Sequence, residues 1–343
     1  MTAADSGKRK KVPATDFGSL LKAMKEAESI SVFGHINPDG DSIGAILALN
    51  IYLRNIGKTD IRLYSRDGSP GFLKFLPGSE LIRVTENPET PPAELAVLVD
   101  CGGPRRAGEE MIPLIKAAKV CAVVDHHATN GGFGDIDIID PRASSTCEIL
   151  TRILEESGER MTPDLATCLY TGIMFDTGRF IHSNTTPDVF RACADLISAG
   201  ANPSKIATSV YKHRSPAHLR MLGYALNNMK TAEDGAISWT VVERSVYDQL
   251  GAVDEDTEGI VEQIGAYSGC EAHIFFSQST DGRTRVSMRS TGRVNVGKIC
   301  EKFGGGGHDF AAGMRSKDPL NNIVERVITE TVKALKKLKS QNQ

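Results

Sequence analysis

Four short apolar runs dominate the first two-thirds of the chain, separated by turns or by stretches with helical periodicity. Each run has the length and composition of a buried strand. Strands that alternate with amphipathic helices are typical of a parallel sheet that helices cover on both faces. The sequence therefore predicts an α/β fold with a doubly wound, mostly parallel sheet. The four runs are SISVFGH (29–35), DIRLYS (60–65), ELAVLVD (94–100) and VCAVVD (120–125).

The pattern changes near residue 209, after a block of helical segments at 146–200. Beyond Pro216, strand-like runs alternate again with helical segments, one of which we expect at 254–266. This predicts a second, smaller α/β domain. The expected division is a disordered basic N-terminal tail at 1–14, a first domain at 15–208, a linker at 209–222 and a second domain at 223–343.

Composition limits the classes of function. Lys and Arg number 40 against 43 Asp and Glu, a formal charge of −3, which argues against a protein that coats long nucleic acid. This overall charge is compatible with a short phosphorylated substrate that a few local charges hold. The seven cysteines are scattered without a CxxC pair, which indicates a reducing compartment and argues against a zinc ribbon. Since the chain lacks a signal-peptide core and an apolar run near the ~20 residues of a membrane span, we expect a cytoplasmic protein with no membrane partner.

The first polar cluster lies in GHINPDGDSIGA (34–45), at the turn between the first run and a helical segment. A nucleotide-binding turn would present glycines and backbone N–H groups to phosphate at this place. This turn instead carries His35, Asp39 and Asp41, and bare carboxylates repel phosphate unless a cation lies between. Alternatively, the two aspartates only form the turn and cap the helix.

Three more clusters of polar residues favour the interpretation that a cation binds here. One apolar run ends at Asp100, and another ends at Asp125 and continues into His126 and His127. Asp176 ends a further apolar stretch. Because the carboxyl ends of strands in a doubly wound sheet converge on one crevice, these distant residues are better explained by one metal site than by separate caps.

The ligand types narrow the choice of metal. Imidazole with several carboxylates suits Mn, Fe, Co or Zn better than Mg or Ca, which prefer oxygen ligands alone. The clusters contain no cysteine, which argues against structural zinc. Two histidines and four or more carboxylates exceed the needs of one ion. A pair of ions about 3.5–4 Å apart, clamping a displacement at phosphorus, fits this inventory.

Five motifs occur in a fixed order along the chain. They are GHINPDGDSIGA (34–45), VDCGG (99–103), VVDHH (123–127), FDTGRF (175–180) and FGGGGHDFAAG (303–313). The first four resemble the motifs of the DHH phosphoesterase superfamily, named for its Asp-His-His run, and the last resembles the hallmark of the accessory DHHA1 domain. The resemblance spans nearly the whole chain. It implies a DHH catalytic domain at 15–208 and a DHHA1 substrate-binding domain at 223–343.

The resemblance further implies a hydrolase with two Mn2+ ions, for which Co2+ or Mg2+ could substitute. The implied metal ligands are His35, Asp39, Asp41, Asp100, His126 and Asp176. One ion would take His35, Asp39 and Asp100. The other would take Asp41, His126 and Asp176 together with Asp100, which would bridge the pair.

The other residues of the Asp-His-His run receive different roles from the resemblance. His127 would face the substrate phosphate, and Asp125 would orient the two histidines. Adjacent side chains diverge at the end of a strand, which allows one imidazole to bind metal while the next faces the crevice. The implied catalytic residues are thus Asp100, Asp125 and His127.

The glycine-rich motif and a basic stretch make up the substrate-binding prediction for the second domain. Successive glycines let backbone N–H groups approach an anion closely. The stretch 281–302 holds six basic residues against two acids, an excess that suits phosphate. Arg289 and Ser290 match the substrate-binding Arg-Ser pair of the family. The predicted substrate-binding residues are His127, Arg289, Ser290, Gly304, Gly305, Gly306, Gly307 and His308.

Within the superfamily the chain looks most like the stand-alone nanoRNases, which are bifunctional oligoribonucleases and 3'-phosphoadenosine 5'-phosphate phosphatases. We expect it to lack the added nucleic-acid module of RecJ-type exonucleases and the membrane segments of the anchored cyclic-dinucleotide phosphodiesterases. The expected reaction is hydrolysis of nanoRNA or dinucleotides such as pApA to mononucleotides, and of 3'-phosphoadenosine 5'-phosphate to AMP, by a water that two metal ions activate.

The sequence is also compatible with other functions. They are a cyclic-di-AMP or pApA-specific phosphodiesterase, a short single-strand DNA exonuclease, and a non-catalytic nucleotide-binding sensor. The sequence does not decide the preferred substrate, the cleavage polarity, the physiological metal or the oligomeric state, a homodimer included.

Overall fold

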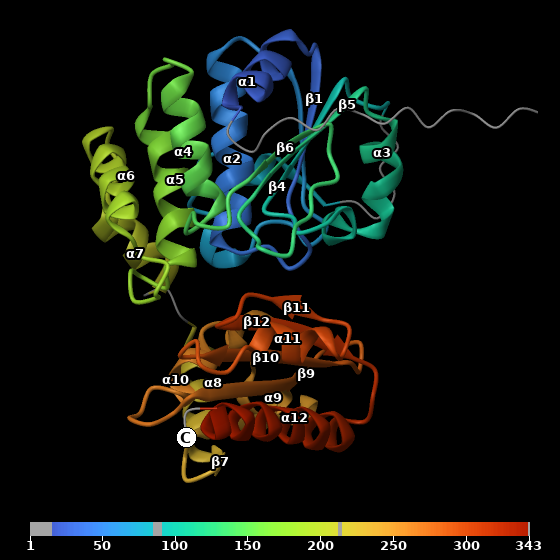
Figure 1. Ribbon diagram of the computed structural model, residues 1–343, viewed down its shortest axis with the longest axis vertical. Coiled ribbons are helices and arrows are strands. Elements are labelled where there is room, and N and C mark those ends of the chain that lie inside the picture. Colours follow the sequence, from blue (N-terminus) through green and yellow to red (C-terminus); the bar gives the residue numbers. More distant parts are fainter. Residues whose placement is uncertain (1–15, 85–90, 212–214, 342–343) are drawn as a thin grey trace, which may run out of the picture. The chain divides into compact units, whose positions relative to one another are not determined.

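The computed structural model describes residues 16–84, 91–211 and 215–341 (Figure 1). The chain divides into two compact units, Met1–His213 and Arg214–Gln343. The predicted basic tail at 1–14 lies outside the described residues.

The first unit is built on a parallel sheet. Its strands lie in the order β3-β2-β1-β4-β5-β6, and every neighbouring pair is parallel. The chain begins at the centre and winds outward to both edges, which confirms the predicted doubly wound α/β fold. The strands are β1 (Ser29–Phe33), β2 (Asp60–Tyr64), β3 (Ile82–Arg83), β4 (Leu95–Val99), β5 (Val120–Asp125) and β6 (Ile136–Ile139).

Helices cover both faces of this sheet. Figure 1 shows α3 on one face and α2, α4 and α5 on the opposite face. The helices are α1 (Phe17–Glu26), α2 (Gly40–Asn55), α3 (Ile112–Ala117), α4 (Thr146–Glu156), α5 (Pro163–Asp176), α6 (Pro187–Ser198) and α7 (Pro203–Tyr211). Short 3-10 turns are η1 (Gly71–Leu73), η2 (Ser79–Leu81), η3 (Pro104–Ala107) and η4 (Glu109–Met111).

Strand β4 illustrates why these strands are continuously apolar. All five of its residues are buried. Leu95, Val97 and Val99 join the core under α2, α4 and α5, whereas Ala96 and Leu98 join the core under α3. Because successive side chains alternate between two covered faces, a central parallel strand has no polar face.

Two glycines let α2 and α5 pack closely. A Cβ atom on Gly44 would lie 2.6 Å from the carbonyl oxygen of Cys168. A Cβ on Gly172 would lie 2.3 Å from Cys147 Sγ and 2.7 Å from Asp41 Oδ1. This close packing brings together the start of α2 and the end of α5, which both carry predicted site residues.

The second unit is a mixed sheet with the strand order β11-β12-β10-β9-β8-β7. The pair β8–β9 is parallel and the other pairs are antiparallel. The predicted second α/β fold is thus confirmed. Its strands are β7 (Lys230–Ala232), β8 (Ile237–Val242), β9 (Ala272–Gln278), β10 (Thr284–Ser290), β11 (Gly306–Gly307) and β12 (Ala311–Ser316).

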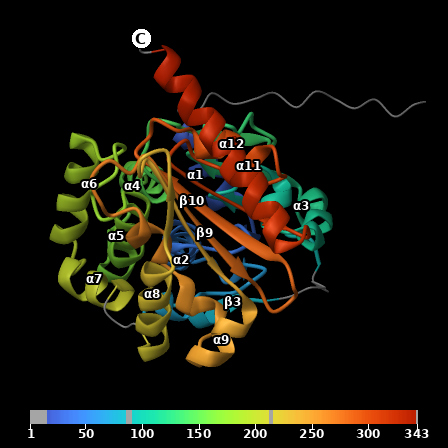
Figure 2. The same cartoon turned by 90° about the horizontal axis from the view of Figure 1, so that it is seen from below.

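Helices also cover this sheet on two faces. One apolar cluster joins it to α11 and α12, and α12 lies against β9 (Figure 2). Another joins it to α8, α9 and α10. The helices are α8 (Pro216–Asn227), α9 (Arg244–Leu250), η5 (Asp254–Thr257), α10 (Ile260–Ile264), α11 (Val296–Glu301) and α12 (Leu320–Gln341).

The helix predicted at 254–266 is interrupted. It divides into η5 and α10 at Gly259, whose φ is +80°. A left-handed residue cannot continue a right-handed helix, so the chain turns there. Among the helices of the described residues, none combines the length and the apolarity needed to cross a membrane.

The close packing of α2 on α5 can be tested with Gly44→Ala. The added methyl group meets a backbone carbonyl that cannot rotate away, so we expect a loss of about 1–3 kcal/mol in the free energy of unfolding of the first unit. Gly71→Ala is the matched control, because no atom lies within 4 Å of its Cβ position. Chemical denaturation measures both, and equal midpoints for the two variants would contradict the packing argument.

Candidate metal centre

The ends of three adjacent parallel strands bring the predicted site residues together. His35 follows β1, Asp100 follows β4, and β5 ends at Asp125, directly before His126. Helix α2 begins beside them and α5 ends there, and these two helices contribute the remaining aspartates. The residues meet because parallel strands present their carboxyl ends at one edge of the sheet.

One group joins His35, Asp39 and Asp100, whose ligand atoms all lie within 4.8 Å of one another. The Nε2 atom of His35 lies 3.2 Å from Asp100 Oδ2 and 3.8 Å from Asp39 Oδ1. Its Nδ1 atom lies 2.8 Å from the carbonyl oxygen of Ile36. If Nδ1 carries the proton and donates it there, Nε2 presents its lone pair to the carboxylates in the neutral ring, as a metal ligand does.

A second group joins Asp41, His126 and Asp176, again with ligand atoms within 4.8 Å of one another. The Nε2 atom of His126 lies 3.0 Å from Asp176 Oδ2 and 3.6 Å from Asp100 Oδ1. Asp100 therefore directs one carboxylate oxygen toward His35 and the other toward His126.

The amino terminus of α4 supports the fully buried carboxylate of Asp41. The backbone N–H groups of Thr146 and Cys147 donate to its two oxygens at 2.7 and 2.9 Å. The Thr146 hydroxyl also donates to Asp100 Oδ1 at 3.4 Å. Ser145 caps the helix, as capping chemistry predicts, but sequence reasoning missed the support for Asp41 because the two segments lie 105 positions apart.

Asp100 itself has a left-handed backbone conformation, with φ of +56°. Aspartate tolerates this region better than most residues, at a cost of about 1–2 kcal/mol. The backbone turns at Asp100 as β4 ends, and its buried carboxylate lies between the two groups.

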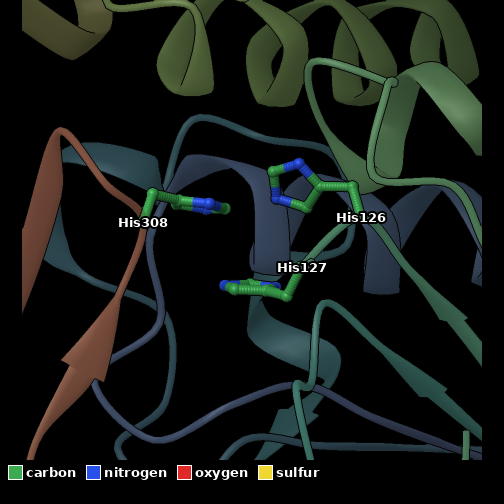
Figure 3. A group of neighbouring side chains, drawn as sticks. All are labelled: His126, His127 and His308. Carbon is green, nitrogen blue, oxygen red and sulfur yellow. The ribbon is translucent and has the colours of Figure 1, made fainter. Parts of the chain in front are cut away.

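The two adjacent histidines make different contacts. His126 pairs with Asp100 and Asp176. His127 Nδ1 lies 2.7 Å from Asp125 Oδ1 and 3.7 Å from Asp100 Oδ1, so the rings share Asp100 but differ in their shorter contacts. Figure 3 shows the two rings leaving the end of β5 in different directions, with His308 of the second unit also labelled. This contact with Asp125 therefore orients His127. The support of His126 by Asp125, which the family resemblance implies, stays a prediction.

Asn130 completes this arrangement and was missed by sequence reasoning. Its Nδ2 atom donates to Asp125 Oδ2 at 2.7 Å and to the carbonyl oxygen of Cys101 at 3.1 Å. Its Oδ1 accepts from the N–H of Gly132 at 2.9 Å. A buried amide with such partners fixes Asp125 and thereby His127. The only sequence signal was its position in the turn after the Asp-His-His run.

The charges of the site suit a cation. Within the described residues, no lysine or arginine forms an ion pair with its carboxylates, whose ion pairs are all with histidines. Buried carboxylates repel one another, and imidazole with carboxylate is a donor set that divalent transition metals accept. The residues present therefore fit a metal centre.

The pKa values show how the site balances its buried negative charge when no metal ion is bound. Burial alone would lower the pKa of His35, but hydrogen bonds to Asp100 and Asp39 raise it to about 10. Burial also opposes charge on His126, yet hydrogen bonds to Asp100 and Asp176 hold its pKa well above the ordinary value. Burial, with the nearby charge of Asp100, raises the pKa of Asp41. Protons on the imidazoles thus supply positive charge that a metal ion would replace.

In the second unit, Arg289 is held by Glu262. Its Nε atom donates to Glu262 Oε1 at 2.9 Å, and its Nη1 donates to the carbonyl oxygen of Met288 at 3.1 Å. Neighbouring Ser290 donates its hydroxyl hydrogen to the carbonyl oxygen of Val294 at 2.6 Å. Sequence reasoning identified Arg289 but not the acid that aligns it.

The four glycines at 304–307 have a structural role inside the second unit. The N–H groups of Gly304 and Gly305 donate to carbonyl oxygens at the end of α11, and the N–H of His308 donates to Ala311. A Cβ on Gly305 or Gly307 would lie 2.4 or 2.5 Å from atoms of the neighbouring strand segment. These three N–H groups are thus engaged within the unit. Anion binding by the loop stays a prediction.

The chain is thus a two-domain α/β protein, and the strand ends of its doubly wound domain carry buried carboxylate–imidazole groups that could hold a cation. Comparison with known families makes the assignment specific. Residues 29–173 match the DHH family, N-terminal domain, and residues 241–340 match the DHHA1 domain. The chain belongs to the DHH family of phosphoesterases, which confirms the family that the motifs indicate.

Relatives of similar length support this assignment. The bifunctional oligoribonuclease and PAP phosphatase NrnA of Thermus thermophilus is 32% identical over 310 residues, 90% of each chain. The protein of that name from Bacillus subtilis is 26% identical and covers 86% of this chain and 91% of its own. The crystal structure of an exopolyphosphatase-related protein from Bacteroides fragilis matches with a TM-score of 0.86 at 26% identity, covering 94% of this chain and 97% of that one.

Removal of divalent ions should make the stability of the protein fall as the pH rises above neutrality. The pKa of His35 is about 10 in the folded ion-free protein against 6.5 ordinarily. Its stabilising contribution is complete below pH 6.5 and is lost as the pH rises through about 10. Between pH 7 and 10, the Tm of chelator-treated protein should drop on the order of 5 °C more than that of ion-saturated protein.

Differential scanning fluorimetry with and without EDTA measures this difference. His35→Gln is the control variant, because it removes the titrating ring and should reduce the pH dependence of the ion-free protein. Identical pH profiles with and without chelator would contradict the proposed exchange of protons for metal.

Proposed function

We propose that the protein hydrolyses short oligoribonucleotides, such as nanoRNA and pApA, to mononucleotides and 3'-phosphoadenosine 5'-phosphate to AMP, with two Mn2+ ions. The relatives from Thermus thermophilus and Bacillus subtilis, each named as a bifunctional oligoribonuclease and PAP phosphatase, support this choice of substrates. The observation that carries the proposal is Asp100, whose two oxygens face two separate carboxylate–imidazole groups.

The proposed ligands of one ion are His35, Asp39 and Asp100, and those of the other are Asp41, Asp100, His126 and Asp176. Two groups of neighbouring side chains support this division, and a third group, Asp100 with Asp125 and His127, contains the proposed phosphate contact. When bound, two divalent ions supply a water of low pKa and neutralise charge on the phosphoryl oxygens. Co2+ or Mg2+ are the proposed substitutes for Mn2+.

The chain's own residues orient the reaction. His127 is the proposed contact to the phosphoryl oxygens through Nε2, since its Nδ1 atom is bonded to Asp125. Asn130 fixes that aspartate in turn. A hydrogen-bond donor held in place before the substrate arrives stabilises developing charge without reorganisation.

In the second unit, Arg289 is the proposed contact to the other phosphate of the substrate. Glu262 supports its orientation through the Nε atom. Ser290, the glycines at 304–307 and His308 are the remaining proposed substrate contacts. The proposed domain boundaries are 15–208 for catalysis, 209–222 for the linker and 223–343 for substrate binding.

A substrate panel tests the proposal. With Mn2+ present, 3'-phosphoadenosine 5'-phosphate, pApA and RNAs of two to five nucleotides should be hydrolysed, and EDTA should abolish turnover. Long single strands of RNA or DNA and cyclic di-AMP should react far more slowly. Asp100→Asn should lower kcat by roughly 10³-fold, because losing an ion removes several kcal/mol of transition-state stabilisation.

The other outcomes identify the rival functions. Preferred turnover of cyclic di-AMP or of short DNA would favour the alternative phosphodiesterase or exonuclease. Binding without turnover of any substrate would favour a nucleotide sensor. Turnover by Asp100→Asn at the wild-type rate would refute the two-ion scheme.

The adjacent histidines give a matched pair of variants. His126→Ala should lose one equivalent of Mn2+, because this ring lies between Asp100 and Asp176. His127→Ala should keep both equivalents and lose about 10²–10³-fold in kcat. Metal analysis of the purified variants with steady-state kinetics distinguishes these results, and equal metal content in the two variants would contradict the division of roles.

A further inference from the structure

The turn that follows α5 has a strained backbone. Gly178, Arg179 and Phe180 are consecutive left-handed residues, with φ of +56°, +64° and +66°. Left-handed conformations cost about 1–2 kcal/mol for each non-glycine residue, so such a turn persists only where surrounding contacts hold it. It reverses the chain directly after Asp176.

The reversal brings two side chains back to the end of α5. Asn184 Nδ2 donates to the carbonyl oxygen of Asp176 at 3.2 Å, and His182 Nδ1 lies 3.2 Å from the same oxygen. A carbonyl at the carboxyl end of a helix has no partner within the helix, so side-chain donors satisfy it. These contacts fix the backbone from which the Asp176 carboxylate projects.

The same Nδ2 atom of Asn184 donates to a second segment. It lies 3.1 Å from the carbonyl oxygen of Ser144, the residue before the cap of α4. Both partners are carbonyl oxygens, so the amide must present its NH2 group to them. The next residues of that segment, Thr146 and Cys147, donate their N–H groups to Asp41.

We propose that Asn184 is a positioning residue that sets the separation of Asp41 and Asp176. It joins the end of α5, which carries Asp176, to the start of α4, whose amides hold Asp41. Both aspartates belong to the group that contains His126. This inference rests on the proposed two-ion function. It predicts that Asn184 controls the geometry of the ion site that contains Asp41 and Asp176, and not that of the other ion site.

Metal binding to the full-length protein tests this proposal. Asn184→Leu removes the donors at similar size, and Asn184→Ala removes them without adding bulk. In either variant one of two Mn2+ equivalents should bind about 10–100-fold more weakly, as is usual when a residue that orients a metal ligand is lost. The other equivalent should keep its affinity. Titration calorimetry and Mn2+ electron paramagnetic resonance report both affinities without relying on activity.

Kinetics provide an independent readout. Raising the Mn2+ concentration should restore kcat of the Asn184 variants, with little change in the KM for pApA. Ser183→Ala, an exposed neighbour in the same turn, is the matched control and should bind both ions as the wild type does.

The outcomes separate this inference from the proposed function. If a folded Asn184 variant, with a Tm within a few degrees of the wild type, binds both ions with unchanged affinity, the role of Asn184 is refuted. Equal weakening of both ions would also refute it, because the role concerns one site. If the wild type itself binds fewer than two ions, or binds two and hydrolyses nothing in the panel, the proposed function fails instead.

Discussion

The buried negative charge of Asp100 is the constraint on which the site of the first unit depends. Its carboxylate lies among other aspartates, and burial would raise its pKa, yet hydrogen bonds to His126 and His35 hold that pKa well below its usual range. Ionised Asp100 therefore requires positive partners on two sides. Protonated imidazoles meet this need in the ion-free protein, and divalent cations meet it without protons. The left-handed backbone at Asp100 is tolerated because surrounding contacts fix it.

The surrounding elements are arranged so that their ends support these charges. Helix α4 directs its amino terminus at Asp41, where free N–H groups and the helix dipole favour an anion. Helix α2 begins at the site with Asp39 as its cap. The glycine contacts between α2 and α5 bring those two helices close enough for their aspartates to meet. Packing and electrostatics are thus coupled, since a shift of either helix would change the spacing of the carboxylates.

Much of the fold followed from local patterns. The strand at 94–100 was predictable because residues buried on both faces must all be apolar. The helix expected at 254–266 was wrong in its continuity, because Gly259 turns the chain. The glycines at 304–307 suggested an anion site, but the lack of a Cβ atom at Gly305 and Gly307 also allows close strand packing, a use that local sequence does not reveal.

The sequence by itself determined the doubly wound architecture and the acids and imidazoles at its strand ends, because both follow from periodicity and from the convergence of parallel strands. Only the tertiary structure decided which side chains support them. Thr146 reaches Asp41 from 105 positions away, and Asn184 reaches Ser144 from 40. No periodicity records such contacts, since each depends on how separate helices pack. The roles of Asn130 and Asn184 were therefore invisible until the chain was folded.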